Sequence, residues 1–231
     1  MNTHYLEKDS TLPQFAGKIW RTLIVDDHPL FRHGLRELLK NEPDLEFCGE
    51  AESEDQAFKL FCSTQFDLVT VDISLQSGQG LNLVSRIKAN KPSVSILVMS
   101  MFDDRVYAER ALAAGASGYV CKQSTNQEII DVIRTVRSGS IYVRQDILER
   151  IALKKVGRKS SLSLENDQLS DRELEVFTLI GQGRTTQAIA KELRLAVSTV
   201  ETYRERLKSK LNLDTGTELT RRAILWVLQN S

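Results

Sequence analysis

Five short apolar runs, separated by segments with apolar residues at helical spacing, constrain most strongly how this 231-residue chain can fold. We expect the runs to form strands at 22–25, 45–49, 68–71, 94–99 and 118–121. Most of them are almost continuously apolar, which is typical of strands that helices cover on both faces. Strands that alternate with helices in this way predict an open, parallel α/β sheet.

Polar side chains follow several of these strands directly. Asp26 and Asp27 come after the first strand, Asp72 after the third and Ser100 after the fourth, and the fifth runs into Lys122. Ligands collect at the carboxyl ends of parallel strands, because the loops converge there. Crowded carboxylates need a compensating cation, and an oxygen-rich site suits Mg²⁺. The pattern therefore predicts a magnesium site with a lysine able to hold an added anion.

Each of these residues also has an ordinary structural interpretation. An aspartate pair after a strand often only shapes a loop or caps a helix. For His28, which follows the pair directly, we favour packing or capping at a helix start over metal binding. The joint placement of the other residues at one edge of the sheet favours a functional site, because unrelated polar residues would be scattered over both edges.

The stretch from Trp20 to Arg137 resembles the receiver domain of two-component response regulators. The resemblance implies a flavodoxin-like five-stranded parallel sheet of order 2-1-3-4-5. It also implies an acidic pair, a phosphoacceptor, a switch hydroxyl, a switch aromatic and a lysine. In this sequence these are, in turn, Asp26 with Asp27, Asp72, Ser100, Tyr119 and Lys122.

That resemblance implies a chemistry for the acidic edge. Asp72 would accept a phosphoryl group from a sensor histidine kinase and become an aspartyl phosphate. Asp27 and Asp72, together with the backbone carbonyl of Ser74, would bind Mg²⁺ directly, and Asp26 would contribute through water. The chain would then catalyse only its own phosphoryl transfer and dephosphorylation. Ser100 and Tyr119 would change position on phosphorylation, and the signal would be a shift in conformational population.

The distribution of charged, apolar and cysteine residues indicates the class of partner and the cellular compartment. The chain carries 31 basic and 31 acidic residues, but residues 18–140 hold 14 against 17 and residues 141–231 hold 16 against 12. The basic excess in the second part makes nucleic acid a candidate partner. No apolar run is long enough to span a membrane, and the start of the chain lacks a signal-peptide pattern, so we expect a cytoplasmic protein. Cys48, Cys62 and Cys121 indicate small core residues rather than disulfides or a zinc site.

The second part of the chain has a helical pattern. A short helix is expected within 144–155, with Ile147, Ile151 and Val156 on one face, followed by a polar connector. Ser170 and Glu173 have the spacing of a capping box, which predicts a helix start. Further helices follow, the third with Val200, Leu207 and Leu211 facing inward and basic residues facing outward, an arrangement suited to the DNA major groove. A plain helical bundle with a solvated basic face is the alternative.

From Leu169 to about Leu228 the sequence resembles the LuxR-type helix-turn-helix, notably at 169–176 and 199–203. The resemblance to both modules in this order indicates the NarL/FixJ subfamily of response regulators. We expect contacts to double-stranded promoter DNA from the third helix, although Ser198 and Glu201 could instead form a local capping box. The candidate contacts are Ser198, Thr199, Glu201, Thr202, Tyr203, Arg204, Arg206, Lys208 and Lys210. The resemblance also implies a homodimer through the last helix, whose apolar face carries Leu219, Ala223 and Val227.

The sequence thus predicts an N-terminal extension (1–19), a receiver domain (20–138), a linker with a short helix (139–164) and an all-α, four-helix DNA-binding domain (165–231). The expected function is phosphorylation-dependent regulation of transcription. Two alternatives are a flavodoxin-like hydrolase with a fused helical domain and a phosphorylation-independent DNA-binding protein with a vestigial receiver. The intact acidic and lysine set argues against the second.

Overall fold

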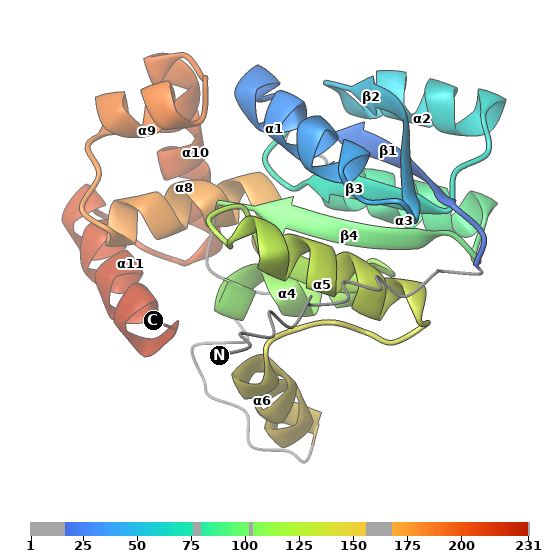
Figure 1. Ribbon diagram of the computed structural model, residues 1–231. Coiled ribbons are helices and arrows are strands. Elements are labelled where there is room, and N and C mark those ends of the chain that lie inside the picture. The colour runs from blue at the N-terminus through green and yellow to red at the C-terminus, as the bar shows by residue number, and fades with distance from the viewer. Residues whose placement is uncertain (1–16, 76–79, 102–103, 156–167, 231) are drawn as a thin grey trace, which may run out of the picture.

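A five-stranded parallel sheet forms the centre of the N-terminal part of the computed structural model, which describes residues 17–75, 80–101, 104–155 and 168–230 (Figure 1). The strand order is β2-β1-β3-β4-β5, as the sequence predicts. The strands are β1 (Trp20–Val25), β2 (Leu45–Ala51), β3 (Leu68–Asp72), β4 (Ser95–Ser100) and β5 (Gly118–Cys121). They agree with the expected ranges to within two residues at each end.

Helices cover both faces of this sheet. Alternate residues of a strand point to opposite faces, so Leu23 and Val25 lie in one buried cluster and Ile24 in another. The cluster around Ile24 includes α1 and α5, whereas α2, α3 and α4 contribute to the cluster on the opposite face. The helices are α1 (Pro29–Lys40), α2 (Glu54–Ser63), α3 (Gly80–Asn90), α4 (Asp104–Ala113) and α5 (Asn126–Arg137). This burial on both faces explains the lack of polar alternation in the strands.

The C-terminal part is helical. The expected short helix is α6 (Gln145–Lys155), in which Ile147 is buried, while Val156 and the connector up to residue 167 lie outside the described residues. Four helices follow, as predicted: α8 (Asp171–Gly181), α9 (Thr186–Glu192), α10 (Val197–Lys210) and α11 (Gly216–Asn230). The capping box of Ser170 and Glu173 is present at the start of α8. Among the described residues, no helix is both long and apolar enough to cross a membrane.

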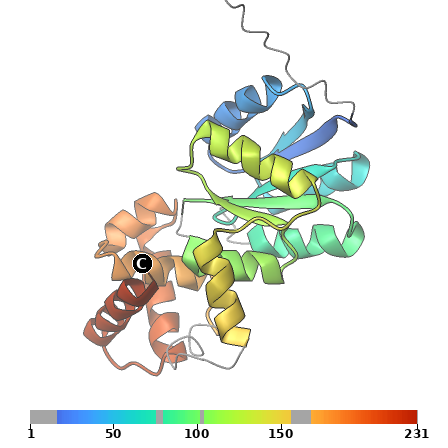
Figure 2. The same ribbon diagram turned by 60° about the horizontal axis from the view of Figure 1, so that its bottom comes forward.

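The two parts pack directly against each other. The carboxyl ends of the strands point toward α8, and Figures 1 and 2 show the C-terminal helices beside that edge of the sheet. Arg110 of α4 donates to the carbonyl oxygen of Leu169 at 2.8 Å and pairs with Asp171 at 2.9 Å. Buried residues of the sheet, of α4 and of α8 form one continuous apolar cluster.

The structure contradicts one expectation, about the cysteines, and one alternative, about Ser198. Cys62 is exposed and Cys48 and Cys121 are only half-buried, so the free cysteines are not core residues. Ser198 does not cap α10, because the helix starts one residue earlier, at Val197, with Ala196 at the N-cap position and no side-chain cap. The capping-box alternative for Ser198 and Glu201 is therefore excluded.

Candidate functional site

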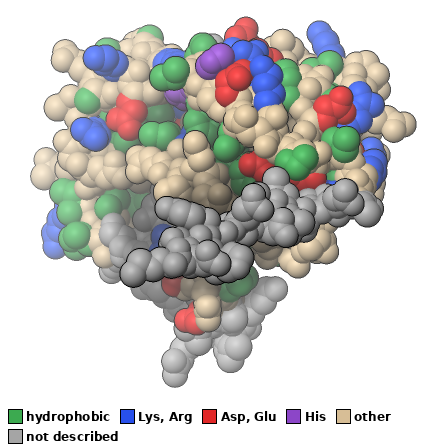
Figure 3. All heavy atoms as spheres, in the orientation of Figure 1, with side chains coloured by type: hydrophobic (Ala, Val, Ile, Leu, Met, Phe, Trp, Pro, Cys, Tyr) green, Lys and Arg blue, Asp and Glu red, His purple; other side chains and the backbone are tan. Residues whose placement is uncertain are grey.

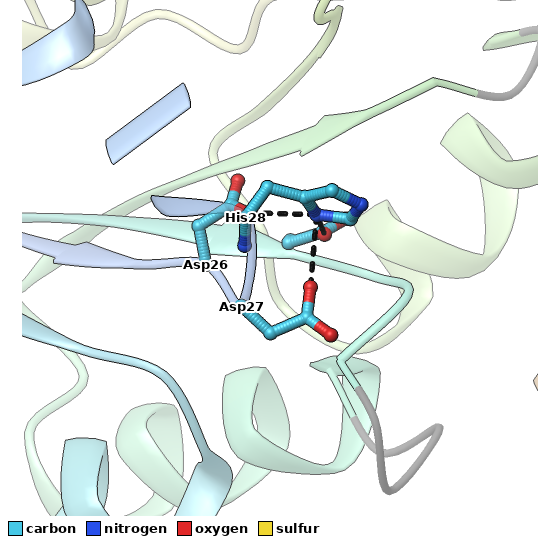
Figure 4. Close-up of side chains that lie close together, drawn as sticks. Asp26, Asp27 and His28 are labelled. Atoms are coloured by element: carbon cyan, nitrogen blue, oxygen red, sulfur yellow. Dashed lines mark hydrogen bonds and ion pairs between the residues drawn. The ribbon is translucent and has the colours of Figure 1, made fainter. Parts of the chain in front are cut away.

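Three carboxylates and an imidazole meet at the carboxyl end of the sheet. One ligand atom from each of Asp26, Asp27, His28 and Asp72 lies within 4.8 Å of the others, and Figure 4 shows the His28 ring beside the first two carboxylates. Asp26 and Asp72 are 1% exposed and Asp27 is 7% exposed. Such burial is costly for charged groups unless they are paired or bind a cation.

Lys122 supplies part of the missing positive charge. Its Nζ lies 2.7 Å from an Oδ2 atom of both Asp26 and Asp72, and its side chain is 2% exposed. The ammonium group also lies 4.8 Å from the centre of the Phe31 ring. The lysine comes from the end of β5 and Asp72 from the end of β3, so the sheet itself brings the pair together.

The environment shifts the pKa values of the two carboxylates that share Lys122 in opposite directions. Burial and the charge of Asp72 raise the pKa of Asp26, with Lys122 opposing the shift. Burial would raise the pKa of Asp72 as well, but hydrogen bonds from His28 and Lys122 hold it below its ordinary value. Asp72 therefore stays ionised, as an attacking carboxylate must.

The side chain of His28 faces the acidic site and does not cap a helix. It occupies the N-cap position of α1, yet its side chain makes no capping hydrogen bond. Its Nδ1 is 2.9 Å from Asp27, 3.1 Å from Asp26 and 3.6 Å from Asp72. The hydrogen bond with Asp72 is the main cause that raises the pKa of His28. The sequence contained a signal for this, because His28 directly follows the acidic pair.

The donor set fits a hard divalent cation. Asp27 Oδ1 is buried and accepts no hydrogen bond, although His28 Nδ1 is nearby, so this oxygen is available as a ligand. Carboxylate oxygens at several positions are the ligands that Mg²⁺ prefers. The backbone N–H of Ser74 donates to Asp72 at 3.0 Å, which places Ser74 at the edge of the same site.

The expected switch residues lie in the core next to the site. Ser100 is fully buried at the end of β4, and its carbonyl oxygen accepts a hydrogen bond from the Lys122 backbone at 2.8 Å. Tyr119 of β5 is 2% exposed, and its N–H donates to the carbonyl oxygen of Tyr142. The sheet therefore links both residues to the acidic cluster through β4 and β5.

Helix α10 presents most of its expected DNA contacts to solvent. The exposed ones are Ser198, Glu201, Thr202, Arg206 and Lys210, whereas Val200 and Leu207 are fully buried, as the periodicity predicts. Thr199, Tyr203, Arg204 and Lys208 are half-buried. On the face shown in Figure 3, acidic and basic side chains are interspersed.

Several charged residues of α10 are paired within the chain. Lys210 lies 2.7 Å from the buried carboxylate of Glu173 and donates to the Gln168 carbonyl oxygen, so it holds α10 against the start of α8. Arg204 lies 3.8 Å from Glu201 and Lys208 lies 2.9 Å from Glu205.

The residues expected to form a dimer surface on α11 lie largely in the interior. Leu219 and Ala223 are fully buried and Val227 is half-buried, because this face packs on α8. A Cβ at Gly181 would lie 2.4 Å from the Ala223 carbonyl oxygen, which shows how closely the helices approach. The assignment of Leu219 and Ala223 to a surface contact is therefore wrong. The exposed apolar side chains of α11 are Ile224, Leu225 and Leu228.

Two residues of the C-terminal part, one in α8 and one in the turn between α9 and α10, also touch the site. Arg194 donates to the backbone oxygen of Asp27, and Glu175 accepts a hydrogen bond from Ser74. No local pattern indicated these contacts, since each joins residues more than 100 positions apart in the sequence.

Comparisons with known proteins agree with this architecture. Residues 22–134 match the response regulator receiver domain, and residues 167–223 match the luxR family of bacterial regulatory proteins. The chain is 33% identical over 209 residues to the response regulator UvrY of Escherichia coli (strain K12), covering 90% of this chain and 95% of that protein. It is 32% identical over 210 residues to the oxygen regulatory protein NreC of Staphylococcus epidermidis, covering 88% and 96%.

Solved structures show the same fold. A LuxR-family two-component response regulator from Aurantimonas sp. SI85-9A1 is 32% identical, with a TM-score of 0.55 over 60% of this chain and 99% of that chain. RcsB from Salmonella enterica serovar Typhimurium is 23% identical, with a TM-score of 0.57 over 89% of this chain and 98% of that chain.

The sheet, its acidic edge and the attached helices define a two-component response regulator. More narrowly, the chain belongs to the NarL/FixJ family of response regulators, which join a receiver domain to a LuxR-type helix-turn-helix, and it is a DNA-binding transcriptional regulator rather than an enzyme. The acidic cluster is typical of the Mg²⁺ site of receiver domains.

Proposed function

We propose that Asp72 accepts a phosphoryl group from a phosphohistidine on a sensor histidine kinase. The observation that carries this proposal is the buried carboxylate of Asp72 at the end of β3, which lies 2.7 Å from Lys122 Nζ. A carboxylate oxygen of Asp72 attacks phosphorus, the bond from phosphorus to the kinase imidazole breaks, and the imidazole leaves with the electron pair. The product is an aspartyl phosphate.

The site holds Mg²⁺ through Asp26, Asp27, Asp72 and the backbone carbonyl of Ser74. When bound, the cation compensates the carboxylates and the charge of the phosphoryl group. Lys122 provides a positive charge next to Asp72, where an added phosphoryl oxygen would lie.

Phosphorylation acts through the residues that the sheet places behind the site. The Ser100 hydroxyl turns toward the phosphoryl group and donates a hydrogen bond, and Tyr119 moves into the space that this rotation leaves. Because packed side chains change between discrete positions, the result is a shift between two conformations. To change the ratio of active to inactive conformation from 1:99 to 99:1, phosphorylation must favour the active conformation by about 5 kcal/mol.

The output is binding of promoter DNA as a homodimer. The solved RcsB structure is of that protein bound to promoter rprA in the presence of phosphomimetic BeF₃⁻, and a second structure is of two RcsB dimers bound to two parallel DNAs. We assign DNA contacts to the exposed residues of α10, among them Ser198, Thr202 and Arg206. Glu201 reads a base edge only if it leaves Arg204, its partner at 3.8 Å. For the dimer we assign the exposed face of α11, with Leu225 and Leu228.

We propose a division into domains that fits this sequence of events. We take residues 20–138 as the receiver, 139–164 as the linker and 165–231 as the DNA-binding domain, with 1–19 as an extension. Because its partners are a kinase domain and promoter DNA, we place the protein in the cytoplasm.

The test is the intact mass of the full chain after incubation with MgCl₂ and acetyl phosphate, for wild type and Asp72→Asn. One phosphoryl adduct is expected, on the wild type alone. The same samples are then titrated with a mixed-sequence duplex DNA, and the phosphorylated wild type is expected to bind more tightly. Equal DNA affinity of both proteins under these conditions would overturn the proposal and favour a vestigial receiver.

A further inference from the structure

Two charged side chains of the DNA-binding domain reach the acidic site of the receiver. Arg194, in the turn between α9 and α10, donates from Nη1 to the Asp27 carbonyl oxygen at 2.8 Å, and Nη1 lies 3.6 Å from Asp27 Oδ2. Glu175 of α8 accepts a hydrogen bond from the Ser74 hydroxyl at 2.9 Å. Both receiver residues belong to the group that would hold Mg²⁺.

A continuous network joins these two contacts inside the DNA-binding domain. Glu175 is fully buried and pairs with Arg172 at 2.6 Å. Arg172 also donates to the carbonyl oxygen of Leu193 at 2.9 Å, directly before Arg194. The turn itself is tightly defined, since Arg194 has a φ of 52°, in the left-handed region. Glu175 and Arg194 are therefore connected to each other through Arg172 and the backbone of Leu193.

A second contact between the two domains involves α4 of the receiver and the start of α8. Arg110 of α4 fixes the start of α8 through Leu169 and Asp171, and the neighbouring Tyr107 is fully buried. The outward side of α10 is left exposed by this arrangement, so the contact holds the turn before α10 rather than covering the DNA-binding residues.

From this geometry we infer that Arg194 and Glu175 are positioning residues of the phosphorylation site, and that their contacts compete with Mg²⁺ and the phosphoryl group. Without metal, the Arg194 guanidinium offsets the charge of Asp27. A divalent cation bound by Asp27 meets that guanidinium as a like charge. A phosphoryl group on Asp72 likewise brings negative charge toward the buried Glu175. The phosphoryl part of this inference rests on the proposed function, whereas the metal part rests on the acidic cluster alone.

The competition works in both directions. If contact between the domains weakens Mg²⁺ binding, then Mg²⁺ must weaken the contact by the same factor. Arg194 therefore lowers the Mg²⁺ affinity of the receiver, and bound Mg²⁺ weakens the contact of Arg194 with Asp27 by the same factor. The sensitivity of the receiver to its signal is in this way partly set by Arg194.

The deciding experiment is a calorimetric titration of the full chain with MgCl₂. Arg194→Gln removes the competing charge and is expected to bind Mg²⁺ roughly three- to tenfold more tightly than wild type. Arg194→Lys keeps the charge and is expected to stay close to wild type, which a merely structural defect would not allow. Because the Arg194 side chain is 38% exposed, the difference should shrink as KCl is raised.

Arg184→Gln is the matched control. Arg184 lies in the same domain, is exposed and pairs with Glu192 at 3.8 Å, and it does not belong to the network of Arg172, Glu175 and Arg194 described above. We expect it to titrate like wild type. Affinity of Arg194→Gln equal to or weaker than that of wild type would overturn the inference.

Hydrogen exchange gives a second measurement on the wild type. Peptides covering 169–176 and 193–197 are expected to exchange faster with MgCl₂ and BeF₃⁻ than without them, and unchanged exchange would overturn the inference. A missing phosphoryl adduct would remove the proposed function but leave the Mg²⁺ titration decisive. An adduct together with unaltered Mg²⁺ binding by Arg194→Gln would keep the function and remove the inference.

Discussion

Lys122 and Asp72 form a buried ion pair, with Nζ and Oδ2 2.7 Å apart, that joins the ends of β5 and β3. The same ammonium lies 2.7 Å from Asp26, so a single lysine balances two buried carboxylates. Breaking such a pair by removing one partner leaves uncompensated buried charge, which costs more than the pair gains. The site is therefore both a functional centre and a point where the fold is sensitive to substitution.

Lys122→Met is expected to lower the free energy of unfolding by about 3 kcal/mol in the presence of EDTA, because Asp26 and Asp72 lose their common partner. Urea denaturation measures this loss, and added MgCl₂ should restore part of it. Lys40→Met is the control, since Lys40 pairs with Glu37 on the exposed face of α1, and it should leave stability nearly unchanged. Equal stability of the two variants would contradict the role of Lys122.

Gly80 lets α3 approach the strand that carries Asp72. A Cβ at this position would lie 2.2 Å from the Asp72 carbonyl oxygen and 2.7 Å from the Ile73 Cα. Gly80→Ala is therefore expected to destabilise the protein by about 1–3 kcal/mol and to weaken Mg²⁺ binding, because the end of β3 must shift. Thermal unfolding and a MgCl₂ titration measure the two effects.

Gly34 provides the opposite case for comparison. It lies inside α1, and a Cβ there would meet nothing within 4 Å. Gly34→Ala should stabilise the protein by about 0.5 kcal/mol, because alanine loses less backbone entropy in a helix. If both alanine variants changed stability in the same direction, close approach at Gly80 would not be the cause.

The sequence predicted those features that depend on short-range pattern. Apolar runs located the strands, the spacing of Ser170 and Glu173 located the start of α8, and the strand ends located Asp72 and Lys122. These predictions succeed because burial and helix capping each require a characteristic pattern of neighbouring residues in the sequence. The sheet order came from the resemblance to receiver domains and is confirmed.

The features that the sequence did not predict depend on tertiary contacts between elements that are far apart in the chain. Periodicity gives α11 an apolar face, but it does not distinguish a face packed on α8 from one left for a dimer, and Leu219 lies on the former. The periodicity of the sequence predicts that Lys210 points toward solvent, but its ammonium group forms an ion pair with the buried Glu173. The contact between Arg194 and Asp27 joins residues 167 positions apart and has no local signal.

The stability of the DNA-binding domain should depend on pH through Glu173. Burial would raise the pKa of Glu173, but hydrogen bonds from Lys210 and Ser170 lower it below its ordinary value of 4.5. A lowered pKa in the folded state contributes stability above the unfolded value, and this is lost as pH falls through the folded value. Glu173→Gln should therefore unfold more easily than wild type at pH 7, by about 1–2 kcal/mol.

The measurement is the difference in unfolding free energy between wild type and Glu173→Gln over a pH series. The difference should be constant from pH 7 down to about 5 and should shrink as pH falls below about 4.5. Glu192→Gln, at an exposed position of α9, serves as the control. A difference that grew on acidification would show that the carboxylate does not carry the stabilisation.

Two basic residues of α10 should separate DNA binding from stability. Arg206 is exposed and lies over the Tyr203 ring, with 5.8 Å between the guanidinium carbon and the ring centre. Arg206→Gln is expected to weaken binding of a mixed-sequence duplex DNA and to reduce the slope of log affinity against log salt by about 1, with little change in Tm. Lys210→Gln should instead lower Tm, because it leaves the buried Glu173 carboxylate without its 2.7 Å partner, and should change the salt slope less. For both variants, fluorescence anisotropy over a KCl series measures the salt slope of DNA binding, and thermal unfolding measures the Tm. The opposite ranking, with Lys210 controlling the salt slope and Arg206 the Tm, would mean that α10 meets DNA through its C-terminal end.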